Sequence, residues 1–226
     1  IKVFNWTATL YKGSIELTAP MILALMFIFN FTIGGLTGMT LGALSADVHV
    51  HDTDFVVAHF HYTMFGGAAT ALFAAMHYWF PKMFGRMYNM THAKVASIIF
   101  FIGFQVLYVP MFILGLQGQP RRYFDYLPEF TNLQQLSTVG SWILATGLIY
   151  MFWNLLYGIV KGKIASANPW RGLTLEWQIE ATPSLYNFDE IPTITKGPYD
   201  YSDEDQLSWW KKWVALFQFK KKRHGN

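Results

Sequence analysis

Four long stretches without Asp, Glu, Lys or Arg constrain the fold more than any other feature of this sequence. A helix needs about 20 apolar residues to cross the hydrocarbon core of a bilayer, and each stretch is longer than that. We therefore expect an all-α, polytopic transmembrane helix bundle with four full spans and the end of a fifth. The expected spans lie at about 18–44, 53–81, 93–117 and 130–160, with the end of an earlier span at 1–10.

The composition agrees with a membrane protein. Hydrophobic residues make up 53% of the chain and charged residues only 14%, whereas about 25% is usual for soluble domains. The long uncharged stretches argue against nucleic-acid binding. The absence of cysteine excludes disulfides, thiolate catalysis and cysteine-held iron–sulfur clusters. The chain opens at Ile1 without an initiator Met, and we expect a fragment or a split subunit.

The loop charges alternate and predict an orientation. Residues 45–54 carry acids but no Lys or Arg, and residues 82–94 carry bases but no acid. The positive-inside rule therefore places 82–94 and the C-terminus in the cytoplasm or matrix, and 45–54 outside. The outer loop 117–130 breaks the pattern with Arg121 and Arg122, and this exception needs a local reason.

Residues 162–226 form a polar tail that is rich in Pro and Gly up to about residue 206. The following segment mixes tryptophans and lysines, which predicts an amphipathic helix over 206–220. Two interpretations are equally favoured. The helix lies on anionic lipid, or it packs against the parent complex.

Two histidines fall inside the second full span, where ionisable residues are costly and usually functional. An α-helix turns about 100° per residue, so the side chains of His59 and His61 point about 200° apart. They cannot bind one metal together, but they can bind two metals on opposite sides of the helix, with Phe60 between them. Neutral imidazole is a common axial ligand of haem iron. Hydrogen bonding within the bundle is the structural alternative. His77, near the inner end, is expected at the membrane interface.

The outer loops hold further candidates. His51 and Asp52 supply half of a divalent metal site, which a partner chain could complete for Mg²⁺. Alternatively, Asp52 or Thr53 simply caps the helix. Arg121 and Arg122 can bind carboxylates, such as haem propionates, through paired hydrogen bonds.

Two alternatives stay open for these charged side chains. The arginines could instead be neutralised by Asp125, Glu129 or lipid headgroups. Lys2 lies in an apolar segment, where its amine serves a proton path or snorkels to an interface.

With these residues in view, the chain resembles subunit I of the haem–copper oxidases. HDTDFVVAHFHY at 51–62 is similar to the family's signature around its haem ligands. The supporting motifs are KVFNW at 2–6, GGLTG at 34–38, QPRRY at 119–123 and NPWRGLTLEW at 168–177. The resemblance covers nearly all of the chain and corresponds to about the last third of a twelve-span subunit.

The resemblance implies two haems, expected to be a-type. It implies that His59 is the axial ligand of the high-spin haem, where oxygen binds, and His61 an axial ligand of the low-spin haem. Phe60 then lies between the haems, and Arg121 and Arg122 bind their propionates.

The resemblance also implies that His51 and Asp52 bind Mg²⁺ together with subunit II, and that Lys2 belongs to a proton-uptake path. The chain departs from many members at Asp54 and Phe55, where two tyrosines are common. The copper-binding histidines of the family have no counterpart here, so copper B belongs to the complex and not to this chain.

The implied function is reduction of O₂ to water with electrons from cytochrome c, coupled to proton translocation. The implied partners are the upstream spans of subunit I, subunit II with its copper centre, subunit III, cytochrome c and membrane lipid. We expect a bacterial plasma membrane, with the mitochondrial inner membrane as the alternative. The rival functions are a quinol oxidase, a proton-coupled multi-span transporter and a purely structural fragment.

Overall fold

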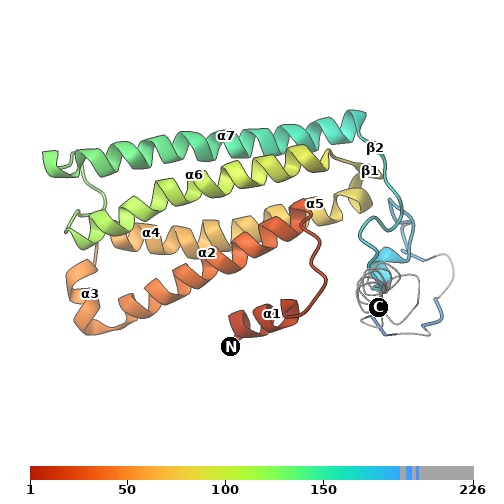
Figure 1. Ribbon diagram of the computed structural model, residues 1–226, viewed down its shortest axis with the longest axis horizontal. Coiled ribbons are helices and arrows are strands. Elements are labelled where there is room, and N and C mark those ends of the chain that lie inside the picture. The colour runs from red at the N-terminus through yellow and green to blue at the C-terminus, as the bar shows by residue number, and fades with distance from the viewer. Residues whose placement is uncertain (189–191, 195–196, 199–226) are drawn as a thin grey trace, which may run out of the picture. The chain divides into compact units, whose positions relative to one another are not determined.

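The computed structural model describes residues 1–188, 192–194 and 197–198, and the helix expected over 206–220 lies outside them. The chain divides into two compact units, Ile1–Ile164 and Ala165–Asn226. The first unit is a helical bundle (Figure 1). We describe each unit by itself.

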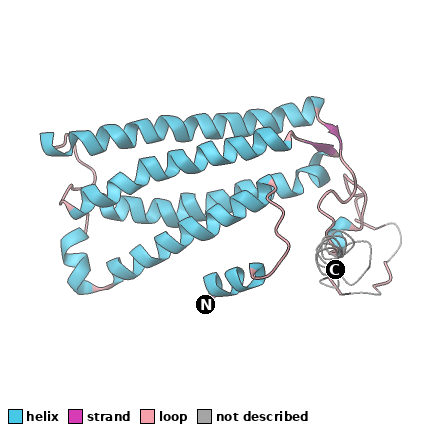
Figure 2. Cartoon of the chain, viewed as in Figure 1, coloured by secondary structure: helices cyan, strands magenta, loops and turns pink. Residues whose placement is uncertain are grey.

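Helices dominate the first unit, as the secondary-structure colouring shows (Figure 2). They are α1 (Lys2–Leu10), α2 (Ala19–Gly42), α3 (Leu44–Val50), α4 (Asp54–Thr63), the π-helix η1 (Met64–Ala69), α5 (Thr70–Phe84), α6 (Met90–Leu116), the 3₁₀ turn η2 (Pro128–Phe130) and α7 (Thr131–Lys161). Strands β1 (Arg86–Met87) and β2 (Lys163–Ile164) pair antiparallel.

Three helices are long and apolar enough to cross a membrane by length and composition: α2, α6 and the run from η2 through α7. The expectation of a mostly helical chain with membrane-length helices is therefore confirmed. The stretch predicted as the second full span forms α4, η1 and α5, whose 10, 6 and 15 residues follow one another without a break. The count of four full spans stays a prediction.

Local sequence explains where these helices begin and end. The Thr53 hydroxyl accepts a hydrogen bond from the Phe55 N–H at 3.3 Å and caps α4. The Asn89 side chain accepts from the first N–H groups of α6 in the same way. Pro20 lies in the first turn of α2, where its missing N–H costs little. Gly85 ends α5 with a φ of 63°, a conformation that glycine adopts without strain.

Helices α6 and α7 form the most extensive helix pair, because glycines let their backbones approach closely. A Cβ atom on Gly103 would lie 2.3 Å from the Leu144 nitrogen, and one on Gly140 would lie 2.3 Å from the Leu107 nitrogen. Helix α4 packs against both α2 and α6. The core of the bundle is largely aromatic and includes Tyr62, Phe73, Phe100, Phe104 and Tyr108.

The α5–α6 connection is fixed to the end of α7. Asn154 is buried, and its side-chain amide donates to the Asn89 carbonyl at 3.0 Å and accepts from the Asn89 N–H at 3.3 Å. The Arg86 guanidinium donates to the Gly162 carbonyl at 2.9 Å. These bonds hold the loop 85–89 against the bundle.

His77 corrects one expectation. It is fully buried, and its Nδ1 hydrogen-bonds the Phe73 carbonyl at 2.7 Å. The Tyr88 ring packs edge-on against it with ring centroids 4.9 Å apart. The expected interface position is wrong because Tyr88, which follows strand β1, covers the imidazole.

The described part of the second unit contains one 3₁₀ turn, η3 (Leu175–Trp177). The Asn168 side chain donates to the Gly172 carbonyl at 2.7 Å and accepts from the Gly172 N–H at 2.9 Å. A Cβ on Gly172 would lie 2.6 Å from the Trp177 ring. The motif NPWRGLTLEW thus forms a turn that Asn168 closes, with the Trp177 ring packed on Gly172.

Candidate functional site

His59 faces helix α2, where Thr37 fixes its ring. The Thr37 hydroxyl lies 3.1 Å from His59 Nδ1 and also donates to the carbonyls of Ile33 and Gly34. When the threonine proton points to a carbonyl, its oxygen accepts a proton from His59 Nδ1. In that tautomer the Nε2 lone pair is free for a metal.

Gly38 provides the space for this ring. A Cβ atom at position 38 would lie 2.9 Å from His59 Cε1, closer than real Cβ contacts. The residue lies on α2 one position after Thr37. The pair therefore determines both the orientation of the imidazole and its closest approach to α2.

His61 is held by a different set of groups. Its Nδ1 lies 2.8 Å from the Val57 carbonyl, which can only accept, so Nδ1 carries the proton. The Tyr108 ring on α6 stacks on the imidazole with centroids 4.4 Å apart and planes 21° apart. The Nε2 lone pair of His61 is again left for a metal.

The two imidazoles lie on different sides of α4, one toward α2 and the other toward α6. Phe60 stands between them in the chain, exposed, with its ring 4.4 Å from that of His61. Among the described residues, no protein group bonds Nε2 of either histidine. A neutral imidazole whose other nitrogen donates to an oxygen is the usual metal-ligating form, so the donor set fits axial ligation of two separate haem irons.

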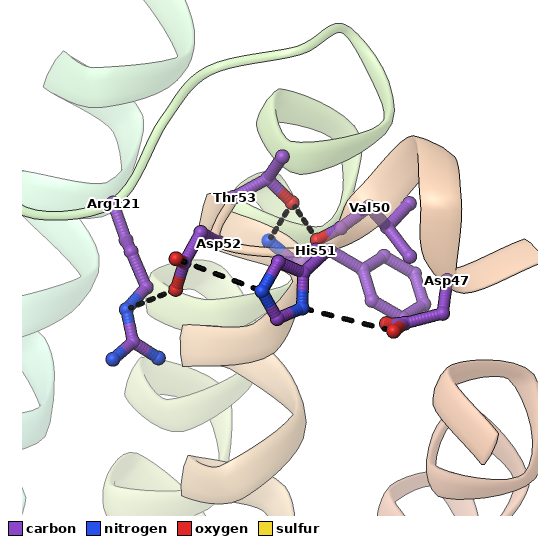
Figure 3. A network of polar contacts seen from close by, with 7 residues as sticks. Asp47, Val50, His51, Asp52, Thr53 and Arg121 are labelled. Atoms are coloured by element: carbon purple, nitrogen blue, oxygen red, sulfur yellow. Dashed lines mark hydrogen bonds and ion pairs between the residues drawn. The ribbon is translucent and has the colours of Figure 1, made fainter. Parts of the chain in front are cut away.

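Backbone pairing joins the turn before α4 to the loop that follows α6. The Asp54 N–H donates to the Gln119 carbonyl at 3.0 Å, and the Arg121 N–H donates to the Asp52 carbonyl at 2.9 Å. Thr53 and Pro120 form an antiparallel bridge between these bonds. This pairing brings the arginine loop beside the start of α4 (Figure 3).

Side chains extend this link, as the dashed lines in Figure 3 show. Arg121 Nε lies 3.3 Å from Asp52 Oδ1, while Asp52 Oδ2 lies 3.7 Å from His51 Nε2. His51 Nδ1 lies 3.7 Å from the Asp47 carboxylate. Arg121 thus pairs with Asp52, and not with the nearby acids of its own loop that the sequence offered as partners. Because Asp52 is 67% exposed, the ion pair contributes little stability.

No group of three or more His, Cys, Asp and Glu in the part of the chain that the structure describes could hold a metal ion. His51 and Asp52 therefore offer two ligands, and a Mg²⁺ site here needs others. Asp52 adopts a φ of 55° and Arg122 a φ of 60°. Non-glycine residues in this left-handed region are uncommon and cluster at functional sites.

A buried acid lies beside this turn. Asp54 is 1% exposed, and its carboxylate accepts a hydrogen bond from the Gln134 amide at 3.4 Å. Burial raises the pKa of the Tyr123 hydroxyl, and the negative charge of Asp54 raises it further. This end of the bundle thus combines Arg121 with a buried carboxylate and a tyrosine whose pKa is raised.

Two candidates stand apart from these clusters. Arg122 is exposed beside Arg121, and Lys2 is exposed at the first residue of α1. In the part of the chain that the structure describes, neither side chain forms a hydrogen bond or ion pair with the other predicted site residues. Their roles remain predictions, as do those of the other candidates: His51, Asp52, His59, Phe60, His61 and Arg121.

Three positioning residues escaped the sequence reasoning. Thr37 and Gly38 lie in the motif GGLTG, which supported the family resemblance but did not indicate that these residues contact His59. Tyr108 carried no signal, because one aromatic among many in an apolar span gives no hint of stacking on His61.

Known proteins resemble this chain over most of its length. Cytochrome c oxidase subunit 1 of Synechocystis sp. is 46% identical over 207 residues, which is 92% of this chain and 38% of that protein. Quinol oxidase subunit 1 of Bacillus subtilis is 42% identical over 199 residues, 86% of this chain and 31% of that protein. The chain thus spans 31–38% of the length of these two relatives.

A solved structure shares the fold. A chain from a cryo-EM structure of a heme–copper terminal oxidase dimer aligns with a TM-score of 0.57 and 28% identity, over 64% of this chain and 28% of that one. The family profile of cytochrome c and quinol oxidase polypeptide I matches residues 1–143. By this match, this chain belongs to the family of cytochrome c and quinol oxidase polypeptide I.

Proposed function

We propose that the chain is part of the catalytic core subunit of a cytochrome c oxidase, which reduces O₂ to water and couples this reaction to proton translocation. The observation that carries the proposal is the pair of imidazoles on α4. Each has its Nδ1 within hydrogen-bond distance of an oxygen, and each leaves Nε2 without a protein partner among the described residues. A transporter that relays protons through histidines needs no such pair.

Two a-type haems supply one-electron redox chemistry and oxygen binding when they are present. His59 would hold the iron of the high-spin haem, and His61 would hold the iron of the low-spin haem. The Val57 carbonyl keeps His61 in the ligating tautomer, and the Thr37 hydroxyl would do the same for His59. Because α4 carries both ligands, it would set how far apart the two haems are held, with Phe60 between the two ligands in the chain.

At the outer face, Arg121 and Arg122 bind haem propionates. The ion pair with Asp52 uses Nε of Arg121. The terminal N–H groups of the guanidinium therefore stay available to donate to a further carboxylate. His51 and Asp52 bind Mg²⁺ with ligands from subunit II. Lys2 forms part of a proton-uptake path.

The activity requires other chains. The upstream part of subunit I supplies the copper B ligands, and subunit II supplies the copper centre that receives electrons from cytochrome c. Subunit III completes the complex. The bacterial relatives favour the plasma membrane as its location.

Quinol is the second candidate donor, because quinol oxidase subunits are among the relatives at 40–42% identity. The test measures oxygen consumption by the complete purified oxidase with reduced cytochrome c and, separately, with a quinol. Turnover with cytochrome c supports the proposal. Turnover with quinol alone would replace it with the second candidate.

A pyridine haemochrome measurement on the same preparation tests the oxidase class itself. Two haems per complex are expected. A complex without haem would rule out an oxidase.

A further inference from the structure

A chain of hydrogen bonds crosses the middle of the bundle. The Tyr62 hydroxyl donates to Gln105 Oε1 at 2.6 Å, and Gln105 Nε2 donates to Asn30 Oδ1 at 2.8 Å. The three residues come from α4, α6 and α2, respectively. Tyr62 and Asn30 are both fully buried, and Gln105 between them is partly buried.

Such a chain defines the register of three helices inside a membrane. Apolar side chains alone determine the position of one helix along another only weakly, because the surrounding lipid is as apolar as they are. A helix that slips by one residue moves about 1.5 Å along its axis and turns about 100°. Such a slip would break the Tyr62–Gln105 bond and leave buried polar groups unpaired, which is unfavourable.

The same three helices hold the two imidazoles. Tyr62 follows His61 directly on α4. His59 contacts Thr37 on α2, and His61 stacks on Tyr108 of α6. The hydrogen-bond chain therefore joins α4 to the two helices against which its histidines are oriented. A rotation or shift of α4 would displace both imidazoles together.

We propose that Tyr62, Gln105 and Asn30 form a positioning clamp, which sets the rotation and depth of α4 and so places His59 and His61 toward their two irons. These are positioning residues, because they act through the histidines. The inference rests on the proposed function, since it concerns the placement of haem ligands.

Tyr62→Phe in the complete oxidase tests the clamp. The variant removes one hydroxyl and keeps the ring packing. We expect a shift of the low-spin haem absorption band together with a changed carbon monoxide difference spectrum of the high-spin haem, because one helix carries both ligands.

Tyr88→Phe is the matched control. It removes the same group from a tyrosine that is also buried, and whose hydroxyl has no hydrogen-bond partner among the described residues. Both haem spectra should stay as in the wild type. A Tyr62→Phe variant that assembles with both spectra unchanged would overturn the clamp.

Gln105→Met tests the same chain from α6. It removes both hydrogen bonds, so it should alter both spectra. Adding Tyr62→Phe to it should change them no further, whereas additive changes would show that the two residues act independently and would also overturn the clamp.

If the Tyr62→Phe oxidase fails to assemble, the Asn30→Ala variant tests the clamp in its place. It leaves the Tyr62–Gln105 bond in place and should shift both haem signals less, in the same direction as Gln105→Met. Unchanged signals in Asn30→Ala would then count against the clamp. A wild-type oxidase without haem would instead refute the proposed function, so the two failures are distinguishable.

Discussion

Replacing Gly38 with alanine places a methyl group against the ring of His59. The added carbon would lie 2.9 Å from His59 Cε1. Ordinary contacts begin at 3.4 Å, so the ring must retreat by about 0.5 Å or α2 must move. Retreat of the ring lengthens the Thr37–His59 hydrogen bond, which is already 3.1 Å long.

The magnitude follows from the cost of overpacking. An extra methylene in a packed core costs about 1–3 kcal/mol. This strain destabilises the position from which His59 would bind the haem iron. It corresponds to about a 5- to 150-fold decrease in the equilibrium constant for binding of the haem by His59. We therefore expect Gly38→Ala to reduce the population of His59-bound high-spin haem by a factor in this range, with a smaller effect at His61.

The assay is the carbon monoxide difference spectrum of the complete oxidase, normalised to the low-spin haem band. Gly42→Ala is the matched control, because it lies one turn further along α2 and a Cβ there meets nothing within 4 Å. A Gly38→Ala enzyme with the wild-type spectrum would refute the reasoning, as would an equal loss in both variants.

Three further predictions concern stability, measured as the thermal denaturation midpoint of the purified complex. Asn154→Ala removes two bonds to the Asn89 backbone and should lower the stability by about 1–3 kcal/mol; an unchanged midpoint would contradict this. Gly140→Ala places a Cβ 2.3 Å from the Leu107 nitrogen, and it should lower the midpoint by forcing α6 and α7 apart, unlike Gly42→Ala. Burial raises the pKa of the Tyr88 hydroxyl above its ordinary value of 10.0. Above pH 10 the unfolded chain has lost this proton while the folded chain keeps it, so stability should fall as the pH rises, and less steeply in Tyr88→Phe. Equal slopes would exclude this contribution.

The helical character of the chain could be predicted because a bilayer leaves few alternatives. A charge-free stretch long enough to cross a bilayer indicates a helix. Helices α2, α6 and α7 coincide with three of these stretches. The π-helix from Met64 to Ala69 could not be predicted. The hydroxyl of Thr70, the first residue of α5, donates to the Phe65 carbonyl of the π-helix. Hydrophobic patterning does not encode this contact.

The site could be predicted in part. Helix geometry alone separates His59 from His61, and the structure places them toward different helices. The choice of neighbours depends on how the helices pack, which one sequence does not reveal. The Arg121–Asp52 pair was missed for the same reason, because it depends on backbone pairing between two loops far apart in the chain.

Haem content and spectra of His59→Ala and His61→Ala in the complete oxidase test the central claim most directly. His49→Ala, which removes an exposed imidazole from α3, serves as the control. We predict that each α4 variant loses the signature of a different haem, the high-spin one for His59 and the low-spin one for His61. Two intact haems in both variants would contradict the account.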